Sequence, residues 1–358
     1  MAKKTKYTIL IICEGDNTEP LFFGAIRDEV MNGYYDIGDV EITIRPEPNV
    51  EETNDSQTSL YKPRRKKLQL RKTTVGIEPE PIKGIPPLKW VEEGKRELAD
   101  GTFNEVWAVF DHDNHPARKE AFEASEEEIY GKKVQIAFSS VSFEYYLLLH
   151  FEKIFRKFQK SECRDKKRPI ICNSGNHKDD CFGKVCIGGY ARRNSYWVDS
   201  KNSTSIFPLV KEKLEIGFEN SAWLRYFSDI NEPGIPIYDR NPYVTTDILV
   251  KRLVGKEDIT WIWISSGIEY TFKKMKVRIL ENQQIELFNS DHAAMIIPEN
   301  SIWKVTPETN SRQNFGKRLL LEPNENQVID LSDCKTNQYD WFLFKYGNYR
   351  IMFEFILG

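Results

Sequence analysis

The sequence predicts an α/β fold, with a parallel sheet that carries helices on both faces, followed by a small all-β domain. Strand-like and helix-like segments alternate over about the first 160 residues, and this order is typical of a parallel sheet. From about Asp258 onward, short strand-like runs recur every eight to twelve residues, as in a sandwich or barrel. The length of 358 residues suits two domains, which we place at residues 1–257 and 258–358.

The first strand and helix illustrate the pattern. Residues 7–13 form a continuous apolar run that ends at the turn-forming sequence EGDN. Pro20 suits the first turn of a helix, and apolar residues at helical spacing follow as far as Val30. Further strands are expected at residues 40–45, 106–110 and 134–138, and further helices at 88–98, 117–130, 143–158 (capped by Ser142), 207–227 and 246–254.

Two insertions interrupt the alternating part, at about residues 46–87 and 161–200. Irregular stretches of this length are usually functional or disordered. In the tail, strands are expected at residues 260–265, 274–280, 284–288, 293–297, 302–305, 318–321, 328–331, 341–346 and 349–357. The tail also carries aromatic residues that either build its core or grip a partner: Trp261, Trp263, Trp303, Trp341, Phe342, Phe344 and Tyr346.

The composition excludes several classes of protein. Hydrophobic residues make up 40% of the chain, and no apolar run approaches the roughly 20 residues that span a bilayer. The first apolar run stops at Glu14 without the small-residue cleavage site of a signal peptide, so we expect it to be a buried strand. A cytoplasmic protein is then expected, and its cysteines would be reduced or bind metal. The net charge of −3 excludes a globally basic nucleic-acid coat but not a local basic patch.

Acidic residues follow two of the predicted strands. Glu14 comes after the first strand, and Asp111 and Asp113 come after the sequence VWAVF. Ligands of parallel sheets bind beyond the carboxyl ends of the strands, and alternate residues of an extended chain share one face. Carboxylates of this kind suit Mg²⁺, so we expect the three to cluster within about 6 Å of one another. Polar turns at strand ends are the alternative explanation.

Four ordered segments carry a more specific resemblance: ILIICEGDNTEPLFF, VWAVFDHDNH, SSVSFEYYLLLHFE and RNPYVTTDILVKRL. Together they resemble the RloB family of bacterial defence proteins over residues 6–254. That family carries a Toprim-like domain, the acidic fold also found in topoisomerases, primases and overcoming-lysogenization-defect nucleases. The resemblance stops before the β-rich tail, which looks atypical for the family. The insertion at about residues 46–87, which contains a run of Lys and Arg, also looks atypical.

The resemblance implies roles for individual residues. Glu14 matches the Toprim glutamate, and Asp111 and Asp113 match its Asp-x-Asp pair, which would hold Mg²⁺ or Mn²⁺. Glu14 would act as a metal ligand or as general acid or base. Glu19 and Glu144 belong to the same blocks of the family and are the other candidate catalytic residues, and Glu144 could bind a second metal. Glu19 and Glu144 are also explained as carboxylates at helix N-termini. His115 and His150 are expected near the same sheet edge, although a lone histidine is more often structural.

Both insertions contain residues that suit ligand binding. Residues 62–72 hold seven Lys or Arg in eleven positions, so Arg64, Arg65, Lys66, Lys67 and Arg71 would contact nucleic-acid phosphates unless the run is only a solvated loop. Arg192 and Arg193 belong to a weaker basic group. A structural Zn²⁺ site is one explanation of Cys163, Cys172, His177, Cys181 and Cys186, and ordinary reduced thiols are the other.

Two functions from different classes agree with these observations. The first is a Mg²⁺-dependent Toprim-type nuclease that cuts RNA or DNA in antiphage defence. The chain lacks a GxxxxGK[ST] phosphate loop, so the ATPase that RloB relatives are often encoded beside would be a separate partner. The second is a non-catalytic sensor or interaction protein in a defence complex. No membrane association is expected, and the sequence leaves the oligomeric state open, with a homo-oligomer as one possibility. The tail, with 13 acidic and 11 basic residues, is expected to recognise protein or to regulate the nuclease.

Overall fold

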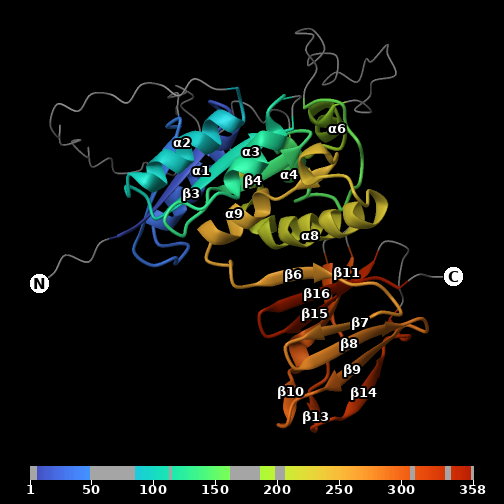
Figure 1. Cartoon of the computed structure of the whole chain (residues 1–358). Helices are drawn as coiled ribbons and strands as arrows, with labels where there is room; N and C mark the ends of the chain where they lie inside the picture. The colour runs from blue at the N-terminus through green and yellow to red at the C-terminus, as the bar shows by residue number, and fades with distance from the viewer. Residues whose placement is uncertain are drawn as a thin grey trace, which may run out of the picture.

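The computed structural model describes residues 6–48, 85–112, 115–161, 186–197, 206–306, 311–334 and 340–355. Figure 1 shows an α/β body built from the first 254 residues or so and a β-rich part that lies against one side of it. The basic run 62–72 and most of the cysteine-rich insertion fall outside the described residues. Within the described residues, no helix combines the length and the apolar character needed to cross a membrane.

The body is built around a five-stranded sheet with the strand order β2-β1-β3-β4-β5. Its strands are β1 (Tyr7–Cys13), β2 (Val40–Arg45), β3 (Glu105–Asp111), β4 (Gln135–Ser140) and β5 (Tyr243–Val244). The first four run parallel, and the short β5 joins β4 in the antiparallel direction. This is the parallel sheet that the alternation of strands and helices predicts.

Helices cover both faces of this sheet, as predicted. Leu10 and Ile12 of β1 point into a core shared with α2 (Leu88–Ala99) and α3 (Arg118–Ser125). Ile9, Ile11 and Cys13 point to the opposite side, where they pack against a larger set of helices. That set comprises α1 (Thr18–Met31), α4 (Phe143–Leu148), α6 (Ile187–Arg193), α7 (Ile206–Val210), α8 (Leu214–Asn231) and α9 (Thr246–Leu253). Successive side chains of a strand alternate between the two faces of the sheet. Because helices cover both faces, the side chains on both are buried.

Some predicted helix boundaries are wrong. The helix expected over residues 143–158 ends at Leu148, and the following chain is irregular as far as Phe158. The Tyr145 hydroxyl explains this path, since it donates to Ile154 O (3.1 Å) and accepts from Arg156 N (3.1 Å), which folds the segment back beside the helix.

Three further boundaries differ. The helix expected over 117–130 is only Arg118–Ser125, and the chain then makes a tight turn at Tyr130 and Gly131, both at positive φ. The helix expected over 207–227 is divided at the 3₁₀ turn η1 (Lys211–Lys213) between α7 and α8. A second 3₁₀ turn, η2 (Ile237–Asp239), precedes β5.

The tail is all-β, as predicted, and its strands form three sheets. A five-stranded sheet contains β12 (Ser311–Asn314), β11 (Ile302–Thr306), β15 (Trp341–Tyr346), β16 (Tyr349–Phe353) and β6 (Thr260–Trp263). A four-stranded sheet contains β14 (Asn326–Asp330), β9 (Gln284–Asn289), β8 (Met275–Leu280) and β7 (Glu269–Phe272). The third sheet is the pair of β10 (Met295–Ile297) and β13 (Leu319–Leu321). The 3₁₀ turn η3 spans Glu299–Ser301. The sequence did not predict β7 and β12, whose apolar residues are few.

The five-stranded sheet of the tail has two apolar faces. Along β15, Phe342 and Phe344 point into a core within the tail, whereas Trp341 and Leu343 join the core of the α/β body. Five of the seven aromatic residues singled out from the sequence are buried, and Trp303 and Tyr346 are half-buried against the two cores.

The contact between the tail and the body is aromatic and passes through α8. Trp261 of β6 packs against Phe218 of α8 with ring centroids 5.1 Å apart. The Lys153 ammonium lies over three tryptophan rings, those of Trp223 (5.4 Å), Trp263 (4.9 Å) and Trp341 (4.9 Å), and pairs with Glu354 at 3.1 Å. Burial lowers the pKa of Lys153. Cations over tryptophan faces are attracted by the ring quadrupole, so Lys153 links the two parts of the chain.

This shared core changes the result expected when residues 258–358 are deleted. The sequence predicts that the body then stays folded, but the deletion would expose α8 and the rings around Lys153. We expect the truncated protein to unfold at a lower temperature and to aggregate, because each fully buried large apolar side chain contributes roughly 1.5–3 kcal/mol. Size-exclusion chromatography and thermal unfolding, with co-expression of the tail as the rescue control, provide the test. A monomeric truncated protein with an unchanged melting temperature would show that the tail is independent.

Candidate functional site

An acidic site lies where β1 and β3 end side by side. Because the two strands are parallel neighbours, their carboxyl ends meet at one edge, where Glu14 N donates to Val109 O at 2.9 Å. A cavity of about 200 Å³ opens there. It is lined by Glu14, Gly15, Asp16, Asn17, Thr18, Glu19, Asp111, Glu144 and Ser161.

The structure brings Glu14 and Asp111 together, as the sequence predicts for these two residues. Glu14 Oε2 accepts a hydrogen bond from the backbone N–H of Asp111 at 2.8 Å. Its other oxygen contacts Nε2 of His115, so His115 does lie at this edge. Asp113, the third member of the predicted cluster, lies outside the described residues. Both oxygens of Glu14 therefore have partners within the protein.

Two helix N-termini supply the remaining carboxylates. Glu19 lies in the first turn of α1 and Glu144 in the first turn of α4, where Glu144 is only 3% exposed. The Ser142 hydroxyl donates to Glu144 at 2.7 Å. A Cβ atom added at Gly15 would lie 2.5 Å from Oε2 of Glu19, so a larger residue at this position would displace the Glu19 carboxylate.

The electrostatics of the site centre on Asp111, which is 9% exposed. Burial raises the pKa of Asp111 well above its ordinary value, and the nearby carboxylates of Glu19, Glu14 and Glu144 raise it further. A hydrogen bond from the backbone N–H of Phe143 opposes this rise. Five carboxylates line this partly closed cavity, those of Asp111, Glu14, Glu19, Glu144 and the exposed Asp16. They repel one another, so they favour either a bound proton or a bound cation. The site can therefore hold positive charge.

The metal sites predicted from the sequence stay predictions. Among the described residues, no group of three or more His, Cys, Asp or Glu side chains is arranged to hold one metal ion. Of the possible zinc ligands, only Cys186 is described, and it is a buried residue immediately before α6. The others, Cys163, Cys172, His177 and Cys181, lie outside the described residues, as do Arg64, Arg65, Lys66, Lys67 and Arg71.

The structure decides between the two explanations of His150 and reveals a role for Arg118. His150 belongs to the core between α4 and α8, where its ring packs against Gly217, and burial lowers its pKa to about 4. It is structural. Arg118 has a role that the sequence did not suggest. Its guanidinium donates to the carbonyls of His112 (3.1 Å) and His115 (2.8 Å), and its Nε donates to Tyr238 O (2.8 Å). Arg118 thus holds both ends of the short loop that follows Asp111, and only its position in the first turn of α3 could have suggested this.

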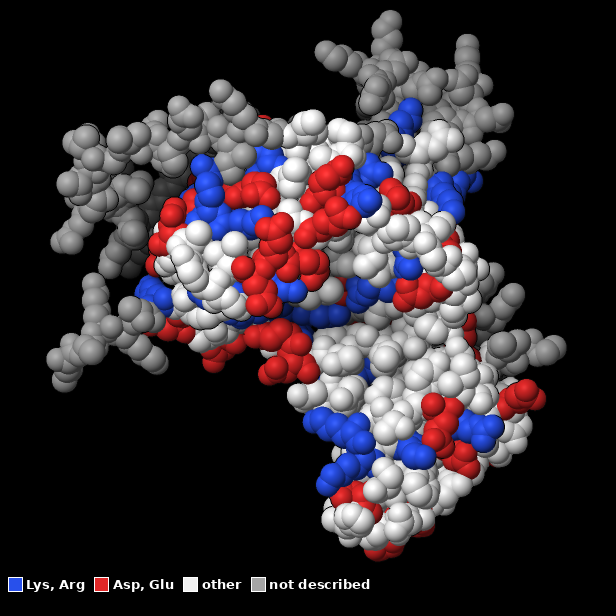
Figure 2. Space-filling view, viewed as in Figure 1, with Lys and Arg blue, Asp and Glu red and all other residues white. Residues whose placement is uncertain are grey.

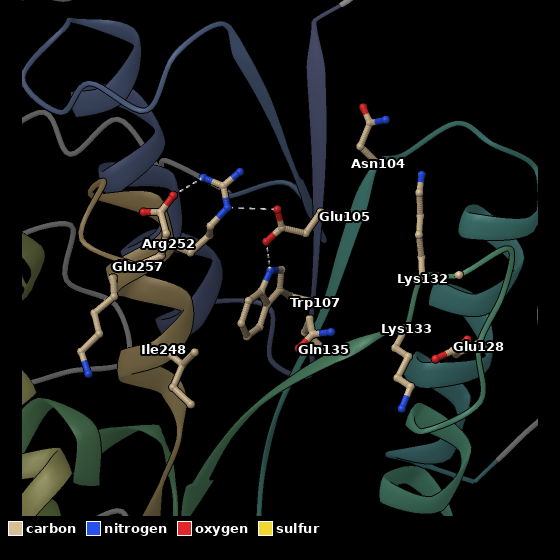
Figure 3. Close-up of a pocket in the computed structure, with 12 residues that line it drawn as sticks. Asn104, Glu105, Trp107, Glu128, Lys132, Lys133, Gln135, Ile248, Arg252 and Glu257 are labelled. Carbon is tan, nitrogen blue, oxygen red and sulfur yellow. Dashed lines mark hydrogen bonds and ion pairs between the residues drawn. The ribbon is translucent and has the colours of Figure 1, made fainter. Parts of the chain in front are cut away.

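A second and larger cavity, of about 530 Å³, lies at the opposite end of the sheet (Figure 3). Glu105, which begins β3, accepts from Trp107 Nε1 at 2.7 Å and from Arg252 at 3.0 Å, and Arg252 also pairs with Glu257 at 3.4 Å. These paired charges tie α9 to the sheet. Because all of these polar groups are engaged with one another, we attribute a structural role to this network.

Comparison with known proteins identifies the family. A family model described as RloB-like protein matches residues 9–253, which is more than half of the chain. The chain belongs to the RloB-like family. The match covers the sheet, the acidic site and α9 of this RloB-like protein and ends before β6. It thereby confirms the resemblance seen in the four sequence segments. No curated protein and no solved structure matches the chain.

Proposed function

We propose that this RloB-like protein is a Mg²⁺- or Mn²⁺-dependent Toprim-type nuclease that hydrolyses RNA or DNA phosphodiesters in bacterial antiphage defence. The observation that carries the proposal is the gathering of Glu14, Glu19, Asp111 and Glu144 around one cavity at the carboxyl edge of a parallel sheet. Their hard oxygen donors fit a divalent cation, which would relieve the repulsion that raises the pKa of Asp111. The defence role, and regulation by a separately encoded ATPase, rest on the RloB resemblance.

Each carboxylate has a task in this proposal. Asp111, fixed at the end of β3, would hold the metal together with Asp113. Glu14 is oriented by the Asp111 N–H and by His115. In the proposed reaction it would move a proton at the scissile phosphodiester. Glu144 is oriented by Ser142 and Glu19 by its position in α1. A bound divalent metal supplies a water of lowered pKa and neutralises charge on the phosphoryl group.

The nuclease proposal is tested directly with purified protein. We expect Mg²⁺- or Mn²⁺-dependent cleavage of at least one member of a panel of single- and double-stranded RNA and DNA, abolished by EDTA. A parallel assay in the presence of the ATPase encoded beside it covers the case in which that partner is required. Absence of cleavage under both conditions would contradict the proposal.

A non-catalytic sensor is the second candidate, and one observation favours it. Both oxygens of Glu14 are engaged by partners within the protein, and the described residues present no ready three-ligand metal group. Such a protein would bind nucleic acid or a phage product without cutting it. Binding without cleavage in the same panel would support this function.

Arg118 provides a further prediction. Arg118→Lys keeps the positive charge but loses the planar fork that donates to both His112 O and His115 O. We expect cleavage to fall about 10- to 100-fold, the range seen when a group that supports metal ligands is changed. Lys119→Ala, on the exposed side of the same helix, is the matched control and should leave the rate unchanged. Equal rates for Arg118→Lys and wild type would show that the fork is not needed.

A further inference from the structure

The larger cavity, at the end of the sheet opposite the acidic site, is built from the starts of two strands, one helix and one turn (Figure 3). Trp107 of β3 and Gln135 of β4 are direct partners on parallel strands, so their side chains point to the same face. Helix α9 forms one wall of the cavity, and residues 128–133 form the other. Its volume of about 530 Å³ lies within the range of small-molecule sites, roughly 300–1,000 Å³.

The wall formed by α9 offers apolar surface. Its two cations are engaged within the protein, since Arg252 pairs with Glu105 at 3.0 Å and Lys251 pairs with Asp247 at 2.7 Å. Ile248 of the same helix is 45% exposed and lines the cavity together with the Trp107 ring. Burial of this apolar surface would favour a ligand with an apolar or aromatic part.

The rest of the cavity presents polar groups that have no partner. Within the described part of the chain, the Lys132 ammonium and the Gln135 amide make no hydrogen bond or ion pair. Asn104 accepts through Oδ1 from Thr8 N (2.9 Å) and Thr8 Oγ1 (3.0 Å), which leaves its Nδ2 donors free. In Figure 3, Lys132 extends toward the end of the cavity where Asn104 lies. One end of the cavity therefore has an unused cation and unused amide donors.

The backbone that carries Lys132 is fixed by a tight turn. Ile129 N donates to Lys132 O at 2.7 Å, and Lys132 N donates to Ile129 O at 3.0 Å. The two residues between them, Tyr130 and Gly131, have positive φ. A backbone that is already ordered reduces the entropy lost when a ligand binds, so the turn favours binding at Lys132.

The charge that would attract a ligand is local. Figure 2 shows acidic and basic side chains interspersed over the α/β body, and the net charge of the protein is −3. Lys133 pairs with Glu126 at 2.9 Å, and Glu128 lies beside Lys133 at the end of the cavity away from Asn104 (Figure 3). An anionic group is therefore attracted to the Lys132 end and not to the cavity as a whole.

We propose that this cavity binds a mononucleotide, with its base against Trp107 and Ile248 and its phosphate on Lys132. The Gln135 amide offers donors and an acceptor side by side, the combination that pairs with the edge of a base. The Lys132 ammonium and the Asn104 amide supply donors for the phosphate oxygens. The inference does not rest on the proposed nuclease function, because none of these residues lines the acidic cavity.

Isothermal titration calorimetry of the full-length protein tests the proposal. The probes are AMP, GMP, CMP and UMP, the four matching nucleosides, and inorganic phosphate. EDTA is present throughout, so that no metal at the acidic site can bind the phosphate. We expect at least one mononucleotide to bind with a Kd below about 1 mM.

Two variants separate the phosphate from the base. Lys132→Gln should weaken mononucleotide binding about 10- to 100-fold, the effect of losing a hydrogen bond to a charged group, and should leave nucleoside binding unchanged. Ile248→Ser should weaken both about 5- to 20-fold, because it removes apolar surface beside the base. The matched controls, Lys119→Gln and Ile230→Ser, change exposed residues outside the cavity and should bind as tightly as wild type.

Several results would overturn the inference. One is the absence of binding by all four mononucleotides at about 1 mM. Another is equal binding by wild type and both cavity variants, since the nucleotide would then bind elsewhere. A third is inorganic phosphate that binds as tightly as the mononucleotides, since the base would then contribute nothing. Thermal unfolding checks that each variant is folded, and Gln135→Ala, at an exposed position of the same cavity, replaces any variant that is not.

Discussion

Asp111→Asn is expected to abolish cleavage and at the same time to stabilise the protein. The substitution removes the charge that would hold the metal, so we expect the rate to fall at least about 100-fold, beyond the effect of changing a supporting residue. It also replaces a buried carboxyl group, whose pKa is raised by burial and by Glu19, Glu14 and Glu144, with a neutral amide. Without divalent metal, the variant should therefore be more stable than wild type by roughly 0.5–2 kcal/mol, the common range for stabilising substitutions.

Thermal unfolding with and without Mg²⁺ separates the two effects. Bound cation stabilises only the native state, so Mg²⁺ should raise the melting temperature of wild type more than that of Asp111→Asn. Asp16→Asn, at an exposed position beside the same cavity, is the matched control and should keep the response to Mg²⁺. If Mg²⁺ shifts wild type and Asp111→Asn equally, Asp111 does not bind the metal. If Asp111→Asn is less stable than wild type without metal, the repulsion at the site has been overestimated.

Asp247→Asn is expected to cause the largest loss of stability. Asp247 is 0% exposed and accepts from Arg225 at 2.5 and 3.0 Å and from Lys251 at 2.7 Å. Burial alone raises the pKa of Asp247, but the two cations more than offset this, so the pKa lies below its ordinary value. The substitution leaves the buried Lys251 and the half-buried Arg225 without their shared anion. A loss of about 3–5 kcal/mol in the free energy of unfolding is expected.

The dependence on pH follows from the lowered pKa. Because Asp247 releases its proton more readily in the folded than in the unfolded protein, its stabilisation is complete above the unfolded pKa of about 3.9. It is lost as pH falls through the lower pKa of the folded state. Urea unfolding should therefore show a constant difference between wild type and Asp247→Asn at pH 5–8, and the difference should shrink in more acidic solution.

Asp229→Asn provides the matched control for Asp247. Asp229 pairs with Arg240 but its side chain is 61% exposed, and exposed ion pairs contribute only about 0–1 kcal/mol. A variant at Asp247 that loses no more stability than the one at Asp229 would show that the buried charge is not what holds α8 and α9 together.

Local sequence determined the sheet and the position of the acidic residues. The apolar runs of β1, β3 and β4 are buried on both faces, and a fully apolar strand has few alternatives to a central place in a parallel sheet. Once those strands are parallel neighbours, their carboxyl ends must meet, so the approach of Glu14 to Asp111 follows from strand order. The family resemblance also lies within this part of the chain.

The tertiary structure alone decided the features that depend on partners distant in the sequence. Apolar spacing extends the helix after Ser142 to Phe158, but contacts of the Tyr145 hydroxyl with Ile154 and Arg156 end it at Leu148. The tail looks like a separate domain, yet alternate residues of β6 and β15 complete the core of the body. Arg118 looks like an ordinary surface residue until the fold places three backbone carbonyls around it. Periodicity reports which face of an element is apolar but not what covers that face, and for polar side chains it does not reveal a partner that folding brings from elsewhere in the chain.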